Sequence, residues 1–440
     1  MTADNASPLV PKLRFPEFGD GPDWLAPQLS ELYSFKRTNT LSRDKLNYES
    51  GTIKNIHYGD IHTKFKPLFR VAEEHLPFIN PDAQANGFDH DAFCNEGDIV
   101  LADASEDLDD VGKAIEVISL NGERVVAGTH TILATRRGNV PVVGFGGQVF
   151  QSPTVRAGIK KEAQGAKVYG ISGNRISTVA IPVPPTVAEQ QKIADCLGSL
   201  DDLIVAEDRK LEVLRQHKLG LMQQLFPLPG ETLPRLRFPE FHDAGEWEIK
   251  QLGELVLFQS GGTPSKANPA FWNGSIPWVS AKDMKRLYLE ETEDHISVAA
   301  VDDGAKLVPA GTLLMLTRGM TLRKDVPICV LRREMSFNQD VKALRPKAGV
   351  NGLFVAFVLL RNKHRLLSMV DVAGHGTGKL NTYELEAFEL ASPKPTEQQR
   401  IAACFSFLDE LLAAQSRKVE GLKTRKRGLL QLLFPSLEGH

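Results

Sequence analysis

Apolar residues along residues 189–227 recur at alternating steps of four and three. This spacing averages about 3.5 residues, which is typical of a coiled coil whose apolar seam faces a partner helix along its length. Glu207 and Lys218 fall on the seam as polar interruptions. The pattern therefore predicts one long helix. Its predicted seam consists of Ile193, Leu197, Leu200, Ile204, Leu211, Leu214, Leu221 and Leu225.

The same pattern returns without a gap at residues 397–435, where 21 of the 39 aligned positions are identical. Its polar interruptions, Gln415 and Lys426, occupy the two matching positions. Two helices with one seam in a single chain are most simply each other's partner, and the long connection between them allows an antiparallel pair. The second predicted seam consists of Ile401, Phe405, Leu408, Leu412, Val419, Leu422, Leu429 and Leu433.

The ends of both helices carry recognisable signals. The stretches Thr186 to Glu189 and Thr396 to Gln399 fit the capping-box pattern at a helix start. Each copy ends in Leu-Phe-Pro, which suits a helix stop. From Ile193 to Leu225 the predicted helix would span roughly 50 Å.

A second repeat precedes each variable part of the chain. Residues 11–32 return as residues 234–255, with 13 of 22 positions identical, and both copies contain Arg-Phe-Pro-Glu-Phe. We name them the RFPEF segments. Each holds a tryptophan, Trp24 or Trp247, which we expect to pack within this repeated part. The chain is therefore two copies of one plan, and such halves are expected to lie about a pseudo-two-fold axis.

The two variable bodies, from about residue 33 to 180 and from about 256 to 390, do not align obviously with each other. Short β-prone runs broken by turn residues indicate mixed α/β bodies with more strand than helix. The predicted fold class is α+β, with two mixed α/β domains separated by an antiparallel coiled coil. The β-prone runs include residues 97–101, 116–118, 141–143 and 311–317, and a helix is expected at residues 353–367. The predicted domains are residues 1–183 and 247–392, the helices are residues 184–228 and 393–440, and residues 229–246 form a Pro-rich linker.

The composition, 42% hydrophobic and 24% charged, is that of a globular protein, and 440 residues suffice for two or three domains. We expect a cytoplasmic protein, because no apolar run reaches about 18 residues and no signal-peptide pattern is present. The net charge of −3 argues against DNA binding through a general positive field, so DNA would need local patches or a basic partner. The cysteines, expected to be small buried hydrophobes, are Cys94, Cys196, Cys329 and Cys404.

The helix faces outside the seams differ in sign, which fits either pairing across the helices or a docking surface. The acidic set is Asp201, Asp202, Glu207 and Asp208, and the basic set is Arg417, Lys418, Lys423, Arg425, Lys426 and Arg427.

The doubled layout, the Leu-Arg-Phe-Pro-Glu-Phe runs and the Glu-Gln-Gln-(Lys/Arg)-Ile-Ala helix starts resemble those of type I restriction–modification specificity subunits. The run that holds Gly261-Gly-Thr-Pro-Ser, Ile276-Pro-Trp-Val and Lys282-Asp-Met adds to this similarity. The resemblance covers essentially the whole chain. Any one motif alone is weak, whereas the doubled architecture is specific.

This resemblance implies a targeting subunit without catalysis of its own. Each variable body would read one half of a bipartite asymmetric site in double-stranded DNA, and the coiled coil would set the spacer. Two modification subunits would methylate adenine N6 with S-adenosylmethionine. Two restriction subunits would cleave with ATP and Mg. No cofactor, metal or membrane contact is expected for this chain itself.

The residues agree with an absence of catalysis. An amino-methyltransferase needs an Asn/Asp-Pro-Pro-aromatic loop, and the stretch that begins at Val183 lacks both the amide and the aromatic residue. Residues 374–380 have the wrong spacing for a P-loop and suit a structural turn, with Lys379 as a phosphate contact. The histidines form no HExxH motif. A stand-alone methyltransferase and a coiled-coil adaptor that binds no DNA stay as alternatives, the latter because of the acidic net charge.

Candidate DNA-binding residues are polar side chains that short loops could bring to base edges or phosphates. For each of them a solvated surface charge is the alternative interpretation. In the first body they are Lys36, Arg37, Asn39, Lys54, His57, Tyr58, Lys64, Arg136 and Arg137. In the second they are Thr263, Ser265, Lys266, Lys282, Arg286, Arg318, Arg323 and Lys324. Of the tryptophans in the second body, Trp272 and Trp278 are expected in the core.

Overall fold

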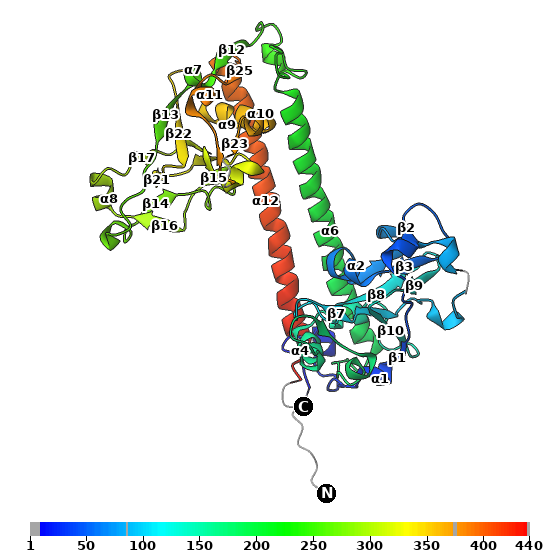
Figure 1. Ribbon diagram of the computed structural model, residues 1–440. Coiled ribbons are helices and arrows are strands. Elements are labelled where there is room, and N and C mark those ends of the chain that lie inside the picture. Colours follow the sequence, from blue (N-terminus) through cyan, green and yellow to red (C-terminus); the bar gives the residue numbers. More distant parts are fainter. Residues whose placement is uncertain (1–8, 85–86, 373–375, 438–440) are drawn as a thin grey trace. The chain divides into compact units, whose positions relative to one another are not determined.

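The computed structural model describes residues 9–84, 87–372 and 376–437. The chain folds into two compact units. Unit 1 comprises residues 1–208 and 417–440, and unit 2 comprises residues 209–416. Each unit contains one variable body together with a stretch of each of the two long helices, α6 and α12 (Figure 1).

The two long helices are continuous, as the apolar period predicts. Helix α6 is Val187–Gln224 and helix α12 is Pro395–Leu433, with 38 and 39 residues. At about 1.5 Å per residue, each is on the order of 57 Å long. Every predicted seam residue of both helices is buried or half-buried. The fully buried ones concentrate where each helix begins and ends, because there the helices also pack against a variable body.

Charged side chains on the two helices show that the helices run in opposite directions. In unit 1, Asp201 pairs with Lys426 at 2.7 Å, and Glu207, further along α6, pairs with Lys418, further back along α12. Lys423 also pairs with Asp208 at 3.2 Å. The predicted antiparallel pair is therefore confirmed, and part of the acidic and basic sets pairs across the helices.

One of these ion pairs has a counterpart in unit 2 at the matching position of the repeat. Lys426 pairs with Asp201 in unit 1, and Lys218 pairs with Asp409 in unit 2. In the repeat alignment Asp201 matches Asp409 and Lys218 matches Lys426. Each lysine that interrupts the apolar seam thus forms one ion pair with the opposite helix. An ion pair at such a position fixes the register of the two helices.

The main sheets of the two units have the same topology, although the bodies do not align in sequence. Each has five strands. Neighbouring strands among the first four are antiparallel, and the fifth strand is parallel to the fourth. In unit 1 the order is β1 (Tyr33–Lys36), β10 (Thr131–Arg136), β6 (Ile99–Ala102), β8 (Ala114–Ser119) and β4 (Leu68–Arg70). In unit 2 it is β13 (Val256–Ser260), β22 (Val341–Pro346), β18 (Leu313–Leu316), β20 (Ile328–Leu331) and β15 (Tyr288–Leu289).

A second sheet and a short strand pair also recur, and each second sheet contains one parallel pair, β3 with β9 or β14 with β21. In unit 1 the second sheet is β2 (Leu46–Asn47), β5 (Phe78–Ile79), β3 (Lys54–Ile56) and β9 (Val125–Ala127), and β11 (Tyr169–Gly170) pairs with β7 (Ala104–Ser105). In unit 2 the second sheet is β16 (Asp294–Ile296), β14 (Ile276–Val279), β21 (Met335–Phe337) and β17 (Leu307–Val308). Unit 2 also has a three-stranded sheet, in which β24 (Gly378–Lys379) lies between β19 (Arg318–Gly319) and β23 (Asp371–Val372), and a separate pair of β12 (Glu248–Gln251) and β25 (Glu389–Ser392).

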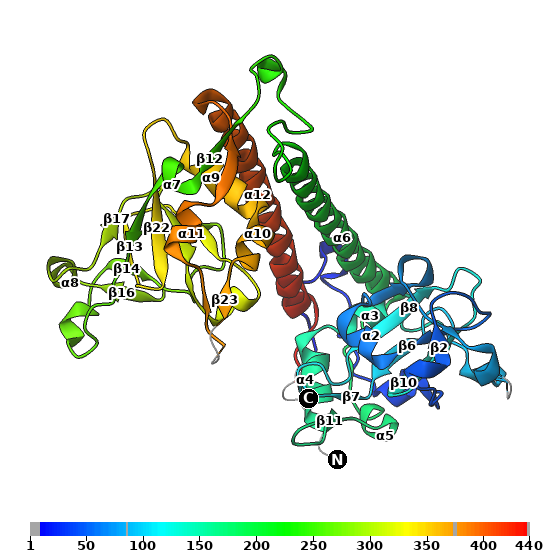
Figure 2. The same cartoon turned by 45° about the horizontal axis from the view of Figure 1, so that its top comes forward.

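Short helices cover the sheets. In unit 2, α9 (Gly352–Arg361) lies between the main sheet and the first half of α12, where Phe357 meets Phe405 with ring centroids 5.1 Å apart (Figure 2). The α-helices of unit 1 are α1 (Leu29–Leu32), α2 (Tyr58–Thr63), α3 (Phe145–Val149), α4 (Pro153–Glu162) and α5 (Gly173–Ile176). Those of unit 2 are α7 (Leu252–Leu255), α8 (Val298–Asp302), α9 (Gly352–Arg361), α10 (Lys363–Ser368) and α11 (Thr382–Glu386).

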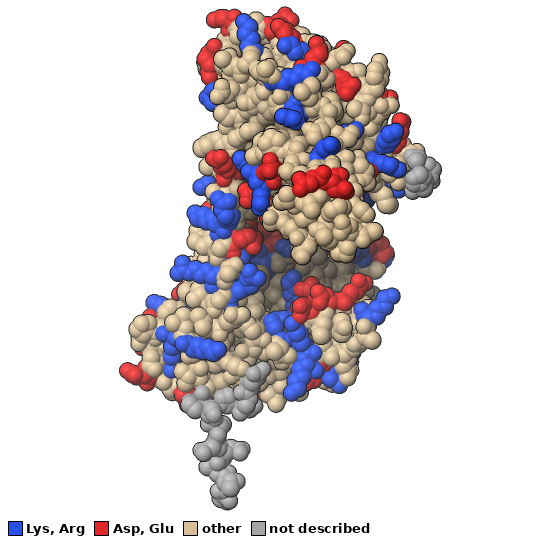
Figure 3. Space-filling model, turned by 90° about the vertical axis from the view of Figure 1, so that its left-hand side faces the viewer, with Lys and Arg blue, Asp and Glu red and all other residues tan. Residues whose placement is uncertain are grey.

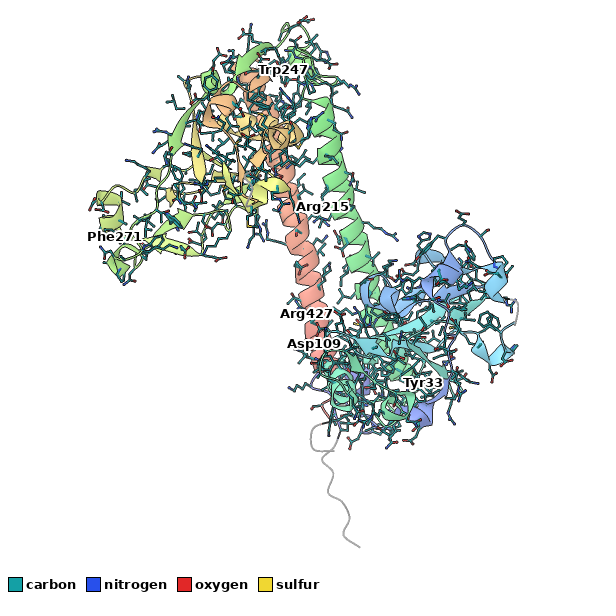
Figure 4. The ribbon with its side chains drawn as sticks, viewed as in Figure 1. Tyr33, Asp109, Arg215, Trp247, Phe271 and Arg427 are labelled. Carbon is teal, nitrogen blue, oxygen red and sulfur yellow. The ribbon has the colours of Figure 1, made fainter. Side chains whose placement is uncertain are left out.

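The RFPEF segments hold each helix start in place through one buried glutamate. Glu189 accepts two hydrogen bonds of 2.8 Å from the Arg14 guanidinium and one of 3.2 Å from Trp24 Nε1. In unit 2 Glu397 accepts two bonds of 2.7 Å from Arg237 and one of 3.2 Å from the Trp247 indole, which lies beside the start of α12 (Figure 4). The hydrogen bond with the carboxylate raises the pKa of each arginine.

The Leu-Phe-Pro segment at the end of each long helix packs in the unit where the other long helix begins. Phe434, at the end of α12, packs edge-on against Trp24, and Phe226, after α6, packs edge-on against Trp247. The two tryptophans are 3% and 2% exposed. The predicted packing role of Trp24 and Trp247 is therefore confirmed. Trp278 is likewise buried, with Trp272 edge-on against it at 5.0 Å.

Four predictions about local structure need correction. Helix α12 already includes Pro395 and Thr396, so Thr396 does not cap it; a proline suits this first turn because its missing N–H would have no partner there. Thr186 does accept the Glu189 N–H at 3.3 Å, but the Glu189 side chain turns to Arg14 instead of completing a capping box. Residues 141–143 form a turn before α3, not a strand. The helix expected at residues 353–367 is two helices, α9 and α10.

The core of unit 1 contains one buried carboxyl group with an altered pKa. Glu116 on β8 is 1% exposed and accepts hydrogen bonds from the N–H groups of Gly144 and Gly147, at 2.9 and 2.6 Å. Burial raises its pKa to about 7, because the charged form loses its hydration, and the two N–H groups only partly offset this.

Removal of the Arg14 side chain should leave the Glu189 carboxylate buried without its cation. Arg14→Ala is expected to reduce the free energy of unfolding of unit 1 by on the order of 3 kcal/mol, measured by chemical denaturation. Lys192→Ala is the matched control. It removes the exposed pair with Glu17, which should cost less than about 1 kcal/mol. Equal losses in the two variants would contradict the anchoring role of Arg14.

A double-mutant cycle with Asp201→Ala and Lys426→Ala should give a coupling energy of about 1–3 kcal/mol, because Lys426 is only 7% exposed and keeps the pair away from water. The same cycle with Asp208→Ala and Lys423→Ala, whose side chains are both 43% exposed, should give about 0.5 kcal/mol or less. A coupling near zero at the first pair would show that it does not fix the helix register.

The raised pKa of Glu116 predicts a pH dependence of stability. The folded-state pKa of about 7 lies above the ordinary value of 4.5, so the folded state holds the proton more tightly. The contribution is fully present below pH 4.5 and is lost as pH rises through 7. Over this window the loss is on the order of 3 kcal/mol. Glu116→Gln should flatten this part of the unfolding free energy against pH, whereas the exposed Glu106→Gln should leave it as in the parent protein.

Candidate nucleic-acid interface

Four chain segments meet at one end of the sheets in unit 1, and we name this place the loop end of unit 1. The segment after β1 donates the Asn39 N–H to Ala127 O at 3.2 Å. Gly128 N–H bonds to Ile56 O at 2.8 Å, which brings in the segment after β3. The segment after β6 joins through Asp103 N–H and His130 O, at 3.1 Å.

The loop end of unit 2 is built by matching hydrogen bonds. Gly262 N–H bonds to Phe337 O at 2.9 Å, Asn338 N–H to Val279 O at 2.9 Å, and Thr317 N–H to Asp340 O at 2.8 Å. Because each bond of unit 2 has a counterpart in unit 1, the residues of one loop end can be matched to those of the other. Loop ends of this kind are where a fixed scaffold can carry variable side chains.

The loop end of unit 1 presents an aromatic cluster. The ring of Tyr58 lies 4.7 Å from that of His57, 6.1 Å from that of His62 and 5.2 Å from that of His130. His130 Nδ1 is 3.3 Å from an Asp103 carboxylate oxygen. His57 is buried and accepts the Gly59 N–H, so it caps α2 rather than facing solvent. Burial, and then the cation of Arg43, lower the pKa of His57.

The loop end of unit 2 carries other chemistry. Thr263 Oγ1 donates a hydrogen bond to Gln339 Oε1, and both side chains are exposed. Arg318 is exposed on β19 and lies opposite Lys379 of β24. Residues 373–375, which include part of the predicted glycine-rich turn, are outside the described residues.

Several candidate lysines are neutralised by carboxylates. Lys36 pairs with Asp91, Lys54 with Glu123 and Lys64 with Asp60, at 2.7, 2.6 and 2.8 Å. Each such pair has no net charge and would attract phosphate less than a free cation would.

Lys282 in unit 2 is held in the same way. It is 3.0 Å from both Glu293 and Asp294, and hydrogen bonds with these two carboxylates raise its pKa. Contact of Lys282 with a phosphate would therefore compete with two acidic neighbours.

Other candidates have structural partners. The Asn39 amide donates to Asn55 Oδ1 and to Ala127 O, both at 2.8 Å. Arg136 donates to Pro141 O at 3.0 Å, and Arg137 N–H bonds to Leu32 O at the far end of β10. The structure thus places Arg136 and Arg137 away from the loop end.

The remaining candidate cations are exposed, and among the described residues they show no carboxylate within ion-pair distance. They are Arg37, Arg137, Lys266, Arg286, Arg318, Arg323 and Lys324. Ser265 accepts the Trp272 indole N–H through its carbonyl oxygen, at 3.2 Å. Contact of these residues with DNA stays a prediction.

The segment after β7 in unit 1 and the segment after β19 in unit 2 carry charges of opposite sign. In unit 2 it holds the exposed Arg323 and Lys324. The corresponding stretch of unit 1, residues 106–110, has four acidic side chains, among them Asp109 at the side of α4 (Figure 4). Only the segment of unit 2 would attract phosphate. More broadly, both signs are interspersed on the face seen in Figure 3.

Gln339 and His130 lie at the loop ends but are not among the residues that the sequence predicted to bind DNA. His130 lies in the turn between β9 and β10, and Gln339 lies in the turn between β21 and β22. Each follows a β-prone run that forms a strand of the second sheet. A short polar turn after such a run is a weak signal, because its importance depends on segments that only the fold brings beside it.

The four cysteines are free thiols, with Cys94 and Cys329 buried. Burial raises the pKa of Cys329 to about 12. In the described parts of the chain no group of three or more His, Cys, Asp or Glu side chains could hold a metal ion. The described helices also include none that is long and apolar enough to cross a membrane.

A family model described as "Type I restriction modification DNA specificity domain" matches residues 244–423. This stretch of the chain belongs to that family. The resemblance carried by the repeated motifs is therefore confirmed.

Curated relatives agree with this assignment. The chain is 34% identical over 169 residues to the type I restriction enzyme EcoR124I/EcoR124II specificity subunit of Escherichia coli, covering 38% of this chain and 42% of that one. It is 27% identical over 186 residues to the type I restriction enzyme MjaIX specificity subunit of Methanocaldococcus jannaschii, covering 40% and 41%. The chain thus aligns with about two fifths of the length of each of these two relatives.

Solved structures share the fold. The S subunit of a type I restriction–modification system from M. genitalium superposes with a TM-score of 0.60 at 15% identity, over 98% of this chain and 100% of that one. A chain from a study of the assembly and conformational transition of the type I restriction–modification system gives a TM-score of 0.54, also at 15% identity, over 94% and 97%. The α+β fold with long helices is therefore that of known specificity subunits.

Proposed function

We propose that this chain is the DNA sequence-specificity subunit of a type I restriction–modification complex. In this proposal each unit binds one half of a bipartite asymmetric site in double-stranded DNA. The observation that carries the proposal is the pair of loop ends. They are built by the same backbone hydrogen bonds yet present different side chains, Tyr58 with its histidines in unit 1 and Gln339 with Arg318 in unit 2. Two such readers would recognise two different short sequences.

The long helices would set the length of the unread spacer between the half-sites. Support comes from their continuity and from the matched Lys–Asp pairs, which oppose sliding of one helix along the other. A helix pair of fixed register cannot change its length in small steps, so the spacer would have a fixed number of base pairs.

Catalysis would be supplied by partner subunits. The chain lacks the Asn/Asp-Pro-Pro-aromatic loop that grips a flipped adenine in amino-methyltransferases. Two modification subunits with S-adenosylmethionine would methylate adenine N6, and two restriction subunits with ATP and Mg would cleave. The net charge of −3 and the neutralised lysines fit a chain that binds DNA tightly only within a complex.

The proposal predicts that one half-site can be exchanged alone. Residues 33–180 should be replaced by the equivalent body of a related specificity subunit, and the methylated-adenine motif of cells with the partner subunits should be sequenced. One half-site should change, while the other half-site and the spacer stay as before. A chimera with residues 256–390 replaced is the reciprocal control.

Change of both half-sites in either chimera would contradict the assignment of one reader to each unit. A purified complex that shows no salt-dependent, sequence-selective binding of duplex DNA would favour the adaptor instead. Methyl transfer by the purified chain alone would contradict the non-catalytic role.

A further inference from the structure

We propose that Gln339 reads an adenine in the half-site of unit 2, and that Thr263 positions its amide. This inference rests on the proposed function and names the residue that would determine one base of the specificity. Gln339 is exposed in the turn between β21 and β22, between Asn338 and Asp340, whose backbone bonds help to build the loop end.

The Thr263 hydroxyl fixes the direction of the Gln339 amide. Thr263 Oγ1 donates to Gln339 Oε1, although the two residues are far apart in sequence. Gly261 makes this approach possible. A Cβ at Gly261 would lie 2.3 Å from the carbonyl oxygens of Phe337 and Asn338, so a larger residue would push the Thr263 segment away from the turn.

The backbone on both sides of Gln339 is anchored. On one side Asn338 is buried, its N–H bonds to Val279 O, and its Oδ1 accepts the Asp340 N–H at 3.2 Å. On the other side Asp340 O accepts the Thr317 N–H at 2.8 Å and the Thr317 hydroxyl at 3.1 Å. Gln339 is therefore an exposed side chain on a fixed turn, which lowers the entropy cost of using it in recognition.

A primary amide matches the major-groove edge of adenine. Adenine offers the N7 acceptor beside the N6 amino donor, and a glutamine meets both with one donor and one acceptor. The bond from Thr263 marks Oε1 as the acceptor and leaves it a second lone pair for the N6 amino group. Guanine has the acceptor O6 in place of the N6 amino donor, so it could not donate a hydrogen bond to the same oxygen.

Cations next to Gln339 would contact phosphates and orient the turn. Arg318 N–H also bonds to Asp340 O, at 3.2 Å, so Arg318 lies close to the turn, and Lys379 lies opposite it across the β19–β24 pair. Both side chains are exposed. Phosphate contacts of this kind fix position without carrying sequence information.

The corresponding position in unit 1 cannot make the same paired contact. Matching hydrogen bonds equate Gln339 with Thr129 and Thr263 with Thr40. Thr129 is half-buried, and its short side chain carries a single hydroxyl. One oxygen cannot set a donor and an acceptor side by side as an amide does, so it cannot meet N6 and N7 of one adenine together. Adenine reading by an amide at this position is therefore a property of unit 2 alone, and Thr129 offers a matched control site in the same chain.

The test sequences the methylated-adenine motif in cells that carry the complete complex with Gln339→Ala. One A·T position in the half-site of unit 2 should become degenerate, with about ten-fold or greater loss of discrimination there. Gln339→Glu, which can only accept, should shift that position towards cytosine. Thr263→Val should relax the same position and no other. Thr129→Ala should leave the half-site of unit 2 unchanged.

Uniformly weaker methylation with an unchanged motif in Gln339→Ala, with thermal unfolding as in the parent protein, would overturn the inference and make Gln339 a phosphate contact. A change in the half-site of unit 1 in the same variant would also overturn it. Absence of any bipartite motif in cells with the parent complex would overturn the proposed function itself. A bipartite motif that does not respond to Gln339 would overturn only the present inference.

Discussion

The buried carboxylates of Glu189 and Glu397 are the contacts on which the rest of each unit depends. Each takes three hydrogen bonds from an arginine and a tryptophan of an RFPEF segment, and each sits in the first turns of a long helix. A carboxylate without a partner in such a place would cost several kcal/mol. The RFPEF segment and the helix start therefore have to come together, which explains why both are repeated.

The matched ion pairs have a different role from the apolar seam. Apolar contacts between two helices are non-directional, so a seam alone would tolerate a shift by one heptad. Lys218 with Asp409 and Lys426 with Asp201 remove this freedom, because a shift would leave charges without partners. The lysines replace apolar contacts at these seam positions, and their ion pairs fix one register of the two helices.

The loop ends combine constancy with variation. The backbone bonds that build them recur in both units, because they belong to the sheets and not to the side chains of the loops. The side chains on that backbone are free to differ, and they do, in charge as well as in shape. A scaffold of this kind can acquire a new specificity without a change of fold.

The sequence alone determined the two long helices, their antiparallel partnership and the packing role of Trp24 and Trp247. These follow from local periodicity and from repeated motifs, which need no knowledge of distant contacts. Only the tertiary structure revealed that the two bodies share one sheet topology, because strand pairing joins distant segments whose residues can change while apolar burial is kept. It also decided which candidate lysines are neutralised, and it brought Gln339 beside Thr263. Side-chain partners far apart in sequence leave no periodic trace, so the chemistry of the loop ends is set only in the folded chain.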